Sequence, residues 1–188
     1  MNQLLHVSAS PHIKDRVTTS SIMLDVIIAL IPATLFGIIQ FKINALLIIV
    51  TTITTCVLAE YLYERFMKKT ITIKDLSAVV TGLILALNLP STVPLWLPVI
   101  GGLFAIIVVK QFYGGLGQNF MNPALAARCF LLISFTGRMT NFVFDGMTSS
   151  TPLAILKNGE SFDLIRVFIG NTAGTIGETS TVALLIGV

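Results

Sequence analysis

Two long apolar runs, residues 22–41 and 43–63, are separated by a single charged residue, Lys42. Each run has about the 20 residues that a helix needs to cross the roughly 30 Å hydrocarbon core of a bilayer. Only 11% of the 188 residues are charged, against about 25% in an ordinary soluble domain. So little charge cannot cover a globule with polar surface. The sequence therefore predicts an all-α, multi-pass membrane protein.

The apolar segments that follow are shorter. They read "LSAVVTGLILALNLP", "LWLPVIGGLFAIIVVK" and "ALAARCFLLISF", and a last one, "LIRVFIGNTAGTIGETSTVALLIGV", is polar in its middle. Residues 76–136 fit either half-helices that are buried in protein or complete helices with Gly and Pro kinks. We expect a break between Gly170 and Ser180. Because the sequence ends inside an apolar run, we also expect further spans beyond it.

Lys and Arg accumulate in cytoplasmic loops, and their distribution predicts the orientation. Basic residues are frequent in the tail 1–21 and in the connector 64–75, whereas Lys42 alone marks the first turn. We therefore expect the tail and the connector to be cytoplasmic. If each short segment of the membrane part, residues 22–136, crosses the cell (inner) membrane, the loop 137–161 is extracytoplasmic. Residues 162–188 then begin the next membrane segments.

Other function classes find little support in the sequence. The net charge is only +3, and no basic run interleaves with aromatic residues as a nucleic-acid surface would need. No nucleotide-binding glycine fingerprint and no HExxH motif is present. Cys56 and Cys129 are either two small apolar residues or part of an iron–sulfur site whose other thiolates come from partner subunits. His6 and His12 lie in the polar tail, and we assign no metal to them.

The loop 137–161 contains an unusual group of hydroxyls, "DGMTSSTPLA", which begins at Asp145. Hydroxyls beside Gly and Pro commonly form turns. Alternatively, one hydroxyl carries a covalent group, because proline holds the preceding Thr151 extended and accessible. The residues alone leave both interpretations open.

This stretch resembles the flavinylation motif Asp-x-x-Ser/Thr-x-Ala/Ser-Thr-Pro-Leu of the RnfD/NqrB family of membrane proteins. Four further stretches resemble that family in the same order: "SPHIKDRVTTSSIMLDVIIALIPA", "DLSAVVTGLILALNLPSTVPLW", "KQFYGGLGQNFMNPALAARCFL" and "GETSTVALLIG". The short polar tail favours the RnfD branch, since the Nqr branch, which belongs to a quinone reductase, has a longer extension. Ser150 stands where the family commonly has Ala. The resemblance also implies a fold of two related repeats, with residues 22–136 in the first repeat and residues 162–188 at the start of the second.

The resemblance implies a membrane component of an ion-translocating ferredoxin:NAD oxidoreductase (Rnf) complex that moves Na⁺ or H⁺. It also implies FMN linked through its phosphate to Thr151 by a flavin transferase. Asp145 is expected in recognition by that transferase or in a turn, and Arg138 and Lys157 either offset the phosphate charge or are ordinary interfacial cations. The motif contributes the other hydroxyl residues of the predicted cofactor site, Thr148, Ser149 and Ser150.

A second, non-covalent flavin (riboflavin) is also implied, and we place it near the stretch "YGGLGQNFMN". Gly115 and Gly117 permit close backbone approach, and Asn119 and Asn122 offer polar groups. Tight helix packing is the alternative explanation of these glycines.

Intramembrane acids are the candidates for the ion pathway, because they are costly in lipid unless they are paired or functional. We favour Glu178 with Thr179, then Asp75, and expect Asp25 and Glu60 simply to reach the interface. A channel or secondary transporter without a redox cofactor, or a structural membrane anchor, remains the alternative function.

Overall fold

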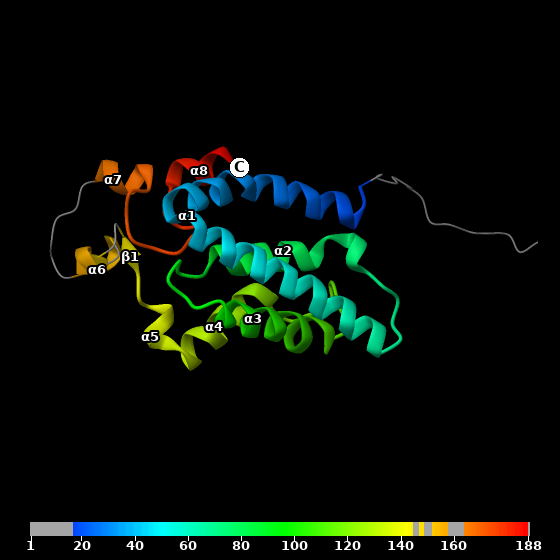
Figure 1. Ribbon diagram of the computed structural model, residues 1–188. Helices are drawn as coiled ribbons and strands as arrows, with labels where there is room; N and C mark the ends of the chain where they lie inside the picture. Colours follow the sequence, from blue (N-terminus) through cyan, green and yellow to red (C-terminus); the bar gives the residue numbers. More distant parts are fainter. Residues whose placement is uncertain (1–16, 145–146, 149–151, 158–163, 188) are drawn as a thin grey trace, which may run out of the picture.

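The structure is a computed structural model that describes residues 17–144, 147–148, 152–157 and 164–187. Its first element, α1 (Thr19–Phe66), comprises both long apolar runs. The helix begins at Thr19, before the predicted residue 22, because Thr18 and Ser21 form a capping box. Lys42 has non-helical angles (φ 57°, ψ −140°), and the chain reverses its direction there (Figure 1). The two halves of α1 therefore correspond to the two predicted spans.

The helices that follow are short, as half-helices are. The 3₁₀ turn η1 (Ile73–Asp75) leads into α2 (Ser77–Leu87), which has 11 residues. At about 1.5 Å per residue, α2 rises only about 17 Å. The next helix, α3 (Trp96–Leu103), continues into a π-helix, η2 (Phe104–Gln111), and α4 (Pro123–Ser134) has 12 residues. The prediction of an all-α fold with several short helices is confirmed.

The remaining elements lie beyond α4. They are α5 (Thr136–Met139), a two-residue pair of antiparallel strands β1 (Val143–Phe144) and β2 (Met147–Thr148), α6 (Pro152–Lys157), α7 (Leu164–Ile169) and α8 (Thr181–Ile186). The predicted loop 137–161 thus contains a short hairpin and a short helix. The helical chain breaks between α7 and α8, where the sequence predicts it.

The broken stretch between α7 and α8 satisfies backbone groups against the end of α2. The backbone N–H of Ile176 donates to the carbonyl of Leu89 at 3.1 Å, and that of Gly177 donates to the carbonyl of Leu87 at 2.8 Å. Pro90 and Thr175 form an isolated bridge at the same place. Non-helical backbone is tolerated at membrane depth only when protein covers it or it lines a cavity. The pairing of these two interruptions meets that condition.

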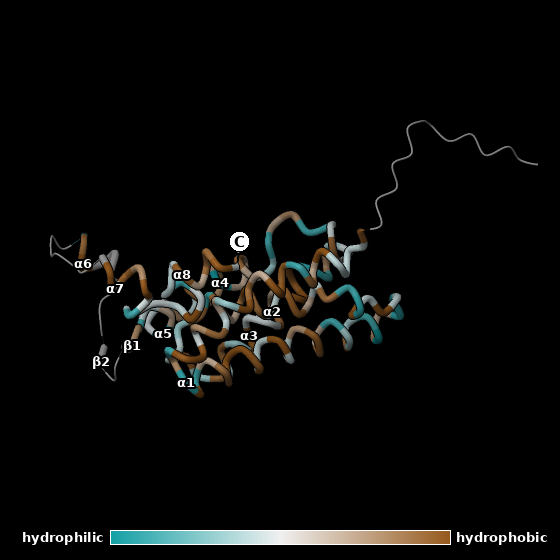
Figure 2. The backbone as a smooth tube through the Cα atoms, turned by 90° about the horizontal axis from the view of Figure 1, so that it is seen from above, coloured by the Kyte–Doolittle hydropathy of each residue, from teal (hydrophilic) through white to brown (hydrophobic). Residues whose placement is uncertain are grey.

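The core lies where α1, α2, α3 and α4 meet, and most of the outer surface is apolar. Leu85, Leu97 and Leu131 are fully buried, whereas Ile39 on α1 is 76% exposed. Figure 2 shows hydrophobic residues along most of the helices, with hydrophilic segments gathered toward the ends of the bundle. A broad exposed apolar surface is what contact with lipid or with further membrane segments requires.

Loops gather at two opposite ends of the bundle (Figure 1). At one end the start of α1 meets the connector, where the Ser20 hydroxyl donates to the Lys74 carbonyl at 3.2 Å. At the other end, the segment between α2 and α3 meets the chain after α5, and the Thr92 hydroxyl donates to the Asn141 carbonyl at 2.6 Å. The Lys42 turn lies at this second end. We call these the connector end and the hairpin end.

Close packing of α1 on α2 depends on Gly82, and this gives a test of the fold. A Cβ atom at Gly82 would lie 2.8 Å from the Ile53 Cα, a backbone atom that cannot yield locally. We expect Gly82→Ala to lower the free energy of unfolding by about 1–3 kcal/mol through overpacking. Thermal unfolding of the purified protein in detergent measures this. Gly137→Ala is the matched control, because a Cβ atom there meets nothing within 4 Å among the described residues. Equal melting temperatures for the two variants would refute the packing assignment.

Candidate functional site

The predicted covalent flavin site falls largely outside the described residues. Asp145, Ser149, Ser150 and Thr151 lie outside them, and Thr148 is described only as part of β2. Two cations on neighbouring elements are described. Arg138 lies in the last turn of α5 and Lys157 in the last turn of α6, and both are exposed. Both elements lie at the hairpin end (Figure 1), so this end offers positive charge to a phosphate group.

The glycine-rich turn after η2 needs glycine for its backbone angles and not for close packing. Gly114, Gly115 and Gly117 have φ values of 114°, 102° and 82°. A Cβ atom at Gly115 or Gly117 would meet nothing within 4 Å among the described residues. Within the described residues, tight helix packing therefore does not explain these two glycines, and their close approach to a flavin stays a prediction.

An aromatic cavity of about 520 Å³ lies beside this turn. Phe104, Tyr113 and Phe120 contribute to its wall, and the rings of Tyr113 and Phe120 pack edge to face with centroids 4.8 Å apart. Asn122 is a polar residue of a largely apolar lining. Volumes of about 300–1,000 Å³, aromatic walls and few polar groups are typical of small-molecule sites. The residues present fit a planar flavin ring.

The two asparagines of the turn also have structural partners. The Asn122 side-chain oxygen accepts from the backbone N–H groups of Ala124 at 3.0 Å and Leu125 at 3.3 Å, which caps α4. Pro123 follows at the first helical position, as the sequence predicts. The Asn119 amide donates to the Met121 carbonyl at 2.8 Å. Neither bond excludes a further contact, since each side chain keeps unused donor or acceptor capacity.

Glu178 pairs with a cation at the junction of the two broken segments. The Arg128 guanidinium donates to Glu178 Oε1 at 3.1 Å and to Asn88 Oδ1 at 2.6 Å. The Glu178 side chain is 55% exposed on this chain. Thr179 is buried, and its hydroxyl has no hydrogen-bond partner among the described residues. The predicted Glu178 and Thr179 thus lie at one junction, and the sequence does not predict Asn88 and Arg128 beside them.

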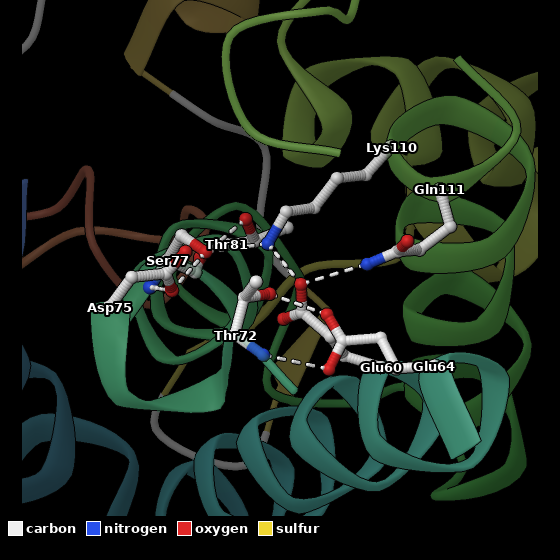
Figure 3. Close-up of polar contacts among 8 residues, drawn as sticks. All are labelled: Glu60, Glu64, Thr72, Asp75, Ser77, Thr81, Lys110 and Gln111. Carbon is white, nitrogen blue, oxygen red and sulfur yellow. Dashed lines mark hydrogen bonds and ion pairs between the residues drawn. The ribbon is translucent and has the colours of Figure 1, made fainter. Parts of the chain in front are cut away.

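The structure contains a buried ion pair near the connector end that the sequence does not predict (Figure 3). Lys110 on η2 donates from Nζ to Glu60 Oε1 on α1 at 2.7 Å, with side-chain exposures of 2% and 0%. Gln111 Nε2 donates to the same oxygen at 2.9 Å. Glu60 therefore does not reach the interface, and that expectation is wrong. The reason is that η2 packs across the last turns of α1 and covers the Glu60 side chain.

Asp75 extends this network through Ser77. The Ser77 hydroxyl accepts from Lys110 Nζ at 2.6 Å and donates to Asp75 Oδ1 at 2.6 Å, while the Ser77 backbone N–H also donates to Asp75 at 2.8 Å. Figure 3 shows Asp75, Ser77, Lys110 and Glu60 connected in this order. The structure brings the predicted Asp75 into contact with the start of α2 and, through one hydroxyl, with the ion pair.

The π-helix η2 explains why two successive polar side chains reach Glu60. Its hydrogen bonds span five residues, as in Phe112 N–H to the Ile107 carbonyl at 3.1 Å. The wider turn directs both Lys110 and Gln111 toward α1, and π-helical turns are frequent at functional sites. A charged residue inside an apolar segment is the signal that identifies such positions in a sequence. Glu60 and Lys110 both carry that signal.

The two cysteines lie in different environments. Cys56 is fully buried, packs in an apolar cluster with Ala59, Ala78 and Ile106, and has a free thiol. Cys129 is exposed and lines the aromatic cavity. Cys56 therefore behaves as a small apolar core residue on this chain. Among the residues that the structure describes, no three His, Cys, Asp or Glu side chains are grouped as metal ligands would be.

Comparison with known sequences shows the family. Residues 6–188 match the NQR2, RnfD, RnfE family. The D subunit of the Na(+)-translocating ferredoxin:NAD(+) oxidoreductase complex of Acetobacterium woodii is 48% identical, over 100% of this chain and 62% of that protein. The proton-translocating counterpart of Clostridium ljungdahlii is 39% identical, over 96% of this chain and 60% of that protein. The D subunit of an ion-translocating oxidoreductase complex of Rhodobacter capsulatus is 33% identical, over 95% of this chain and 61% of that protein.

The chain belongs to the NQR2, RnfD, RnfE family of membrane proteins. The resemblance inferred from five sequence stretches is confirmed at the level of the family, and these relatives are D subunits of ion-translocating oxidoreductase complexes. The chain spans about three fifths of the length of these relatives. Membrane localisation follows from the family and from the long apolar helix α1.

Proposed function

We propose that the chain is part of the membrane-embedded D subunit of an ion-translocating ferredoxin:NAD oxidoreductase (Rnf) complex and carries FMN on Thr151. The observation that carries this proposal is the 48% identity, over the whole chain, to the Acetobacterium woodii protein of that complex. The flavinylation motif at Asp145 to Leu153 supports the cofactor. The other subunits of the complex and a flavin transferase are then its partners.

The arrangement of the two ends supports the proposed orientation. Arg65, Lys69 and Lys74 belong to the connector end, and the hairpin end carries the elements that flank Thr151. By the distribution of basic residues, the connector end faces the cytoplasm. The flavin-bearing loop then lies at the extracytoplasmic rim of the cell membrane. An electron carrier held at this rim would be reached from partner subunits and not from cytoplasmic NAD.

The chain's own part in the chemistry is attachment and orientation. The Thr151 hydroxyl would form a phosphoester with FMN, and that phosphodiester keeps a negative charge that Arg138 and Lys157 can offset. When bound, the flavin supplies the redox step. Attachment keeps the ring from diffusing away while leaving it free to turn on its ribityl chain. Asp145 would serve the transferase, because a carboxylate next to the phosphate would repel it.

The aromatic cavity is our candidate site for the second flavin. Phe104, Tyr113 and Phe120 would pack against a planar ring, and Asn122 in the same lining offers a hydrogen bond. Asn119 lies in the adjoining turn but does not line this cavity, so its contact with a flavin stays a prediction. The positive φ angles of Gly115 and Gly117 shape the adjoining turn. Riboflavin without a phosphate suits this place, since the cavity lining formed by the described residues contains no cation.

For the coupled ion, the Glu178 junction is the first candidate and Asp75 the second. The hydroxyls of Thr175 and Thr179 are buried there without partners among the described residues. Oxygen donors of this kind, with the Glu178 carboxylate nearby, suit a hard cation. Asn88 and Arg128 complete the junction. The coupled ion is Na⁺ or H⁺, because the complex of one relative is named for Na⁺ and that of another for protons.

Covalent flavin separates this function from a channel or an anchor, but not from an Nqr-type quinone reductase component, because the motif belongs to both branches of the family. The protein, expressed with and without a flavin transferase, is separated on a denaturing gel and illuminated. We expect a fluorescent band only with the transferase, because a phosphoester survives denaturation and a non-covalent flavin does not. A dark band in both lanes, with equal protein stain, would favour the channel or the anchor.

A further inference from the structure

The Glu60 carboxylate is buried, and one of its two oxygens has no hydrogen-bond partner among the described residues. Its Oε1 accepts from Lys110 and Gln111, whereas Oε2 is buried and has no hydrogen-bond partner among the described residues. The side chain as a whole is 0% exposed. An ionised carboxylate in such a site is only partly compensated. The buried carboxylate is therefore costly in its ionised form, and an added proton would remove the charge.

A cavity of about 100 Å³ lies beside this pair, and Lys110 is part of its mostly apolar wall. A single water molecule needs about 10–15 Å³ of space for its centre, so the cavity has room for several waters. Ser77, Thr81, Asn119 and Asn122 supply hydrogen-bonding groups to the wall. Among the described residues, Lys110 is the only titratable side chain in the lining, and Glu60 does not line the cavity. Lys110 is therefore the titratable side chain, among the described residues, that contacts both the cavity and Glu60.

We propose that Glu60 is a proton-loading site that Lys110 connects to water in this cavity. First, an N–H bond of the Lys110 ammonium breaks and an O–H bond forms on Glu60 Oε1, which leaves both side chains neutral. Second, the Lys110 amine takes a proton from a hydronium ion in the cavity, whose O–H bond breaks and which becomes water. One proton has then been taken up, and the reverse steps release it.

The charged and titratable groups around Glu60 come from three elements. They are Lys110 on η2, Asp75 on η1 and Glu64 on α1. Cys56, one turn earlier on α1, is a further titratable neighbour. Negative charge that arrives on a redox carrier elsewhere in the complex would favour loading. That last link rests on the proposed function, whereas the protonation itself does not.

Infrared spectroscopy of the purified full-length protein tests the site without any need for redox activity. We expect a carbonyl-stretch band of a buried carboxylic acid that appears as the pH is lowered, shifts in D₂O and is lost in Glu60→Gln. Glu64→Gln is the matched control and should keep the band, since Glu64 lies on the same helix but accepts from Thr72 and not from Lys110. If Glu60→Gln is not recovered folded, the double variant Glu60→Gln/Lys110→Met serves, because it leaves no buried charge in the pair.

The rate of deuterium exchange at the Glu60 carboxyl tests the proton relay through Lys110. In Lys110→Met we expect deuterium exchange of the Glu60 carboxyl to slow by about a hundredfold, the lower range for a positioned acid–base group. A band that persists in Glu60→Gln, that never appears at any pH, or that responds to Na⁺ and not to pH would overturn the site. Unchanged exchange in Lys110→Met would overturn the relay. A protein without covalent flavin that still shows the Glu60 band would refute the proposed function alone.

Discussion

The variant Thr151→Val is expected to carry no covalent flavin while remaining inserted and folded. Valine keeps the size and branching of threonine but has no hydroxyl to form the phosphoester. Thr151 lies outside the residues that the structure describes. Because valine matches threonine in size, we expect the helical bundle to stay intact. Flavin fluorescence of the denatured band, normalised to protein stain, should fall from the wild-type value to background.

Ser150→Ala is the matched control for this variant. It removes the neighbouring hydroxyl but creates the residue that the family commonly has before the threonine, so we expect full flavinylation. Fluorescence that persists in Thr151→Val and disappears in Ser150→Ala would move the attachment site by one residue. Persistence in both variants would place the flavin elsewhere on the chain.

Lys110→Met is expected to be the most destabilising single substitution of the buried network. It removes the ammonium and leaves the Glu60 carboxylate buried with Gln111 as its remaining donor among the described residues. Breaking a buried ion pair from one side costs about 3–5 kcal/mol. The melting temperature of the protein in detergent should fall strongly, and less so at low pH, where protonation of Glu60 removes the uncompensated charge.

Two further variants identify the cause of that loss. Adding Glu60→Gln to Lys110→Met should restore much of the stability, because no buried charge remains in the pair. Lys74→Met, a substitution of an exposed lysine in the connector, should change the melting temperature little. If the double variant were as unstable as Lys110→Met, the lysine would act through packing of its aliphatic chain and not through its charge.

Much of the fold follows from the sequence because apolar length is a strong signal. The two runs on either side of Lys42 predict the two halves of α1, and the low charge predicts the apolar outer surface. The interruption between Gly170 and Ser180 is also visible in the sequence, as Gly and polar residues inside an apolar segment. The sequence does not show which segment forms hydrogen bonds with this interruption. The end of α2 lies far away along the chain, and only folding pairs Leu87 and Leu89 with the interruption.

The candidate sites also differ in whether the sequence alone predicts them. Thr151 is predicted from a linear motif, which a single sequence can carry. Glu60 and Lys110 are separated by 50 positions, and their pairing depends on how η2 crosses α1. Sequence reasoning places Glu60 at an interface because it lies near the end of a span. The π-helical turn that brings Lys110 and Gln111 to it has no recognisable pattern in "FAIIVVKQ".

Mass spectrometry of the protein purified from native membranes determines whether Thr151 carries FMN. We expect an intact mass that exceeds that of the polypeptide by one FMN less one water, and a peptide containing Thr151 that carries the whole of this addition. A polypeptide of unmodified mass from the active complex, or the addition on a peptide without Thr151, would contradict this expectation.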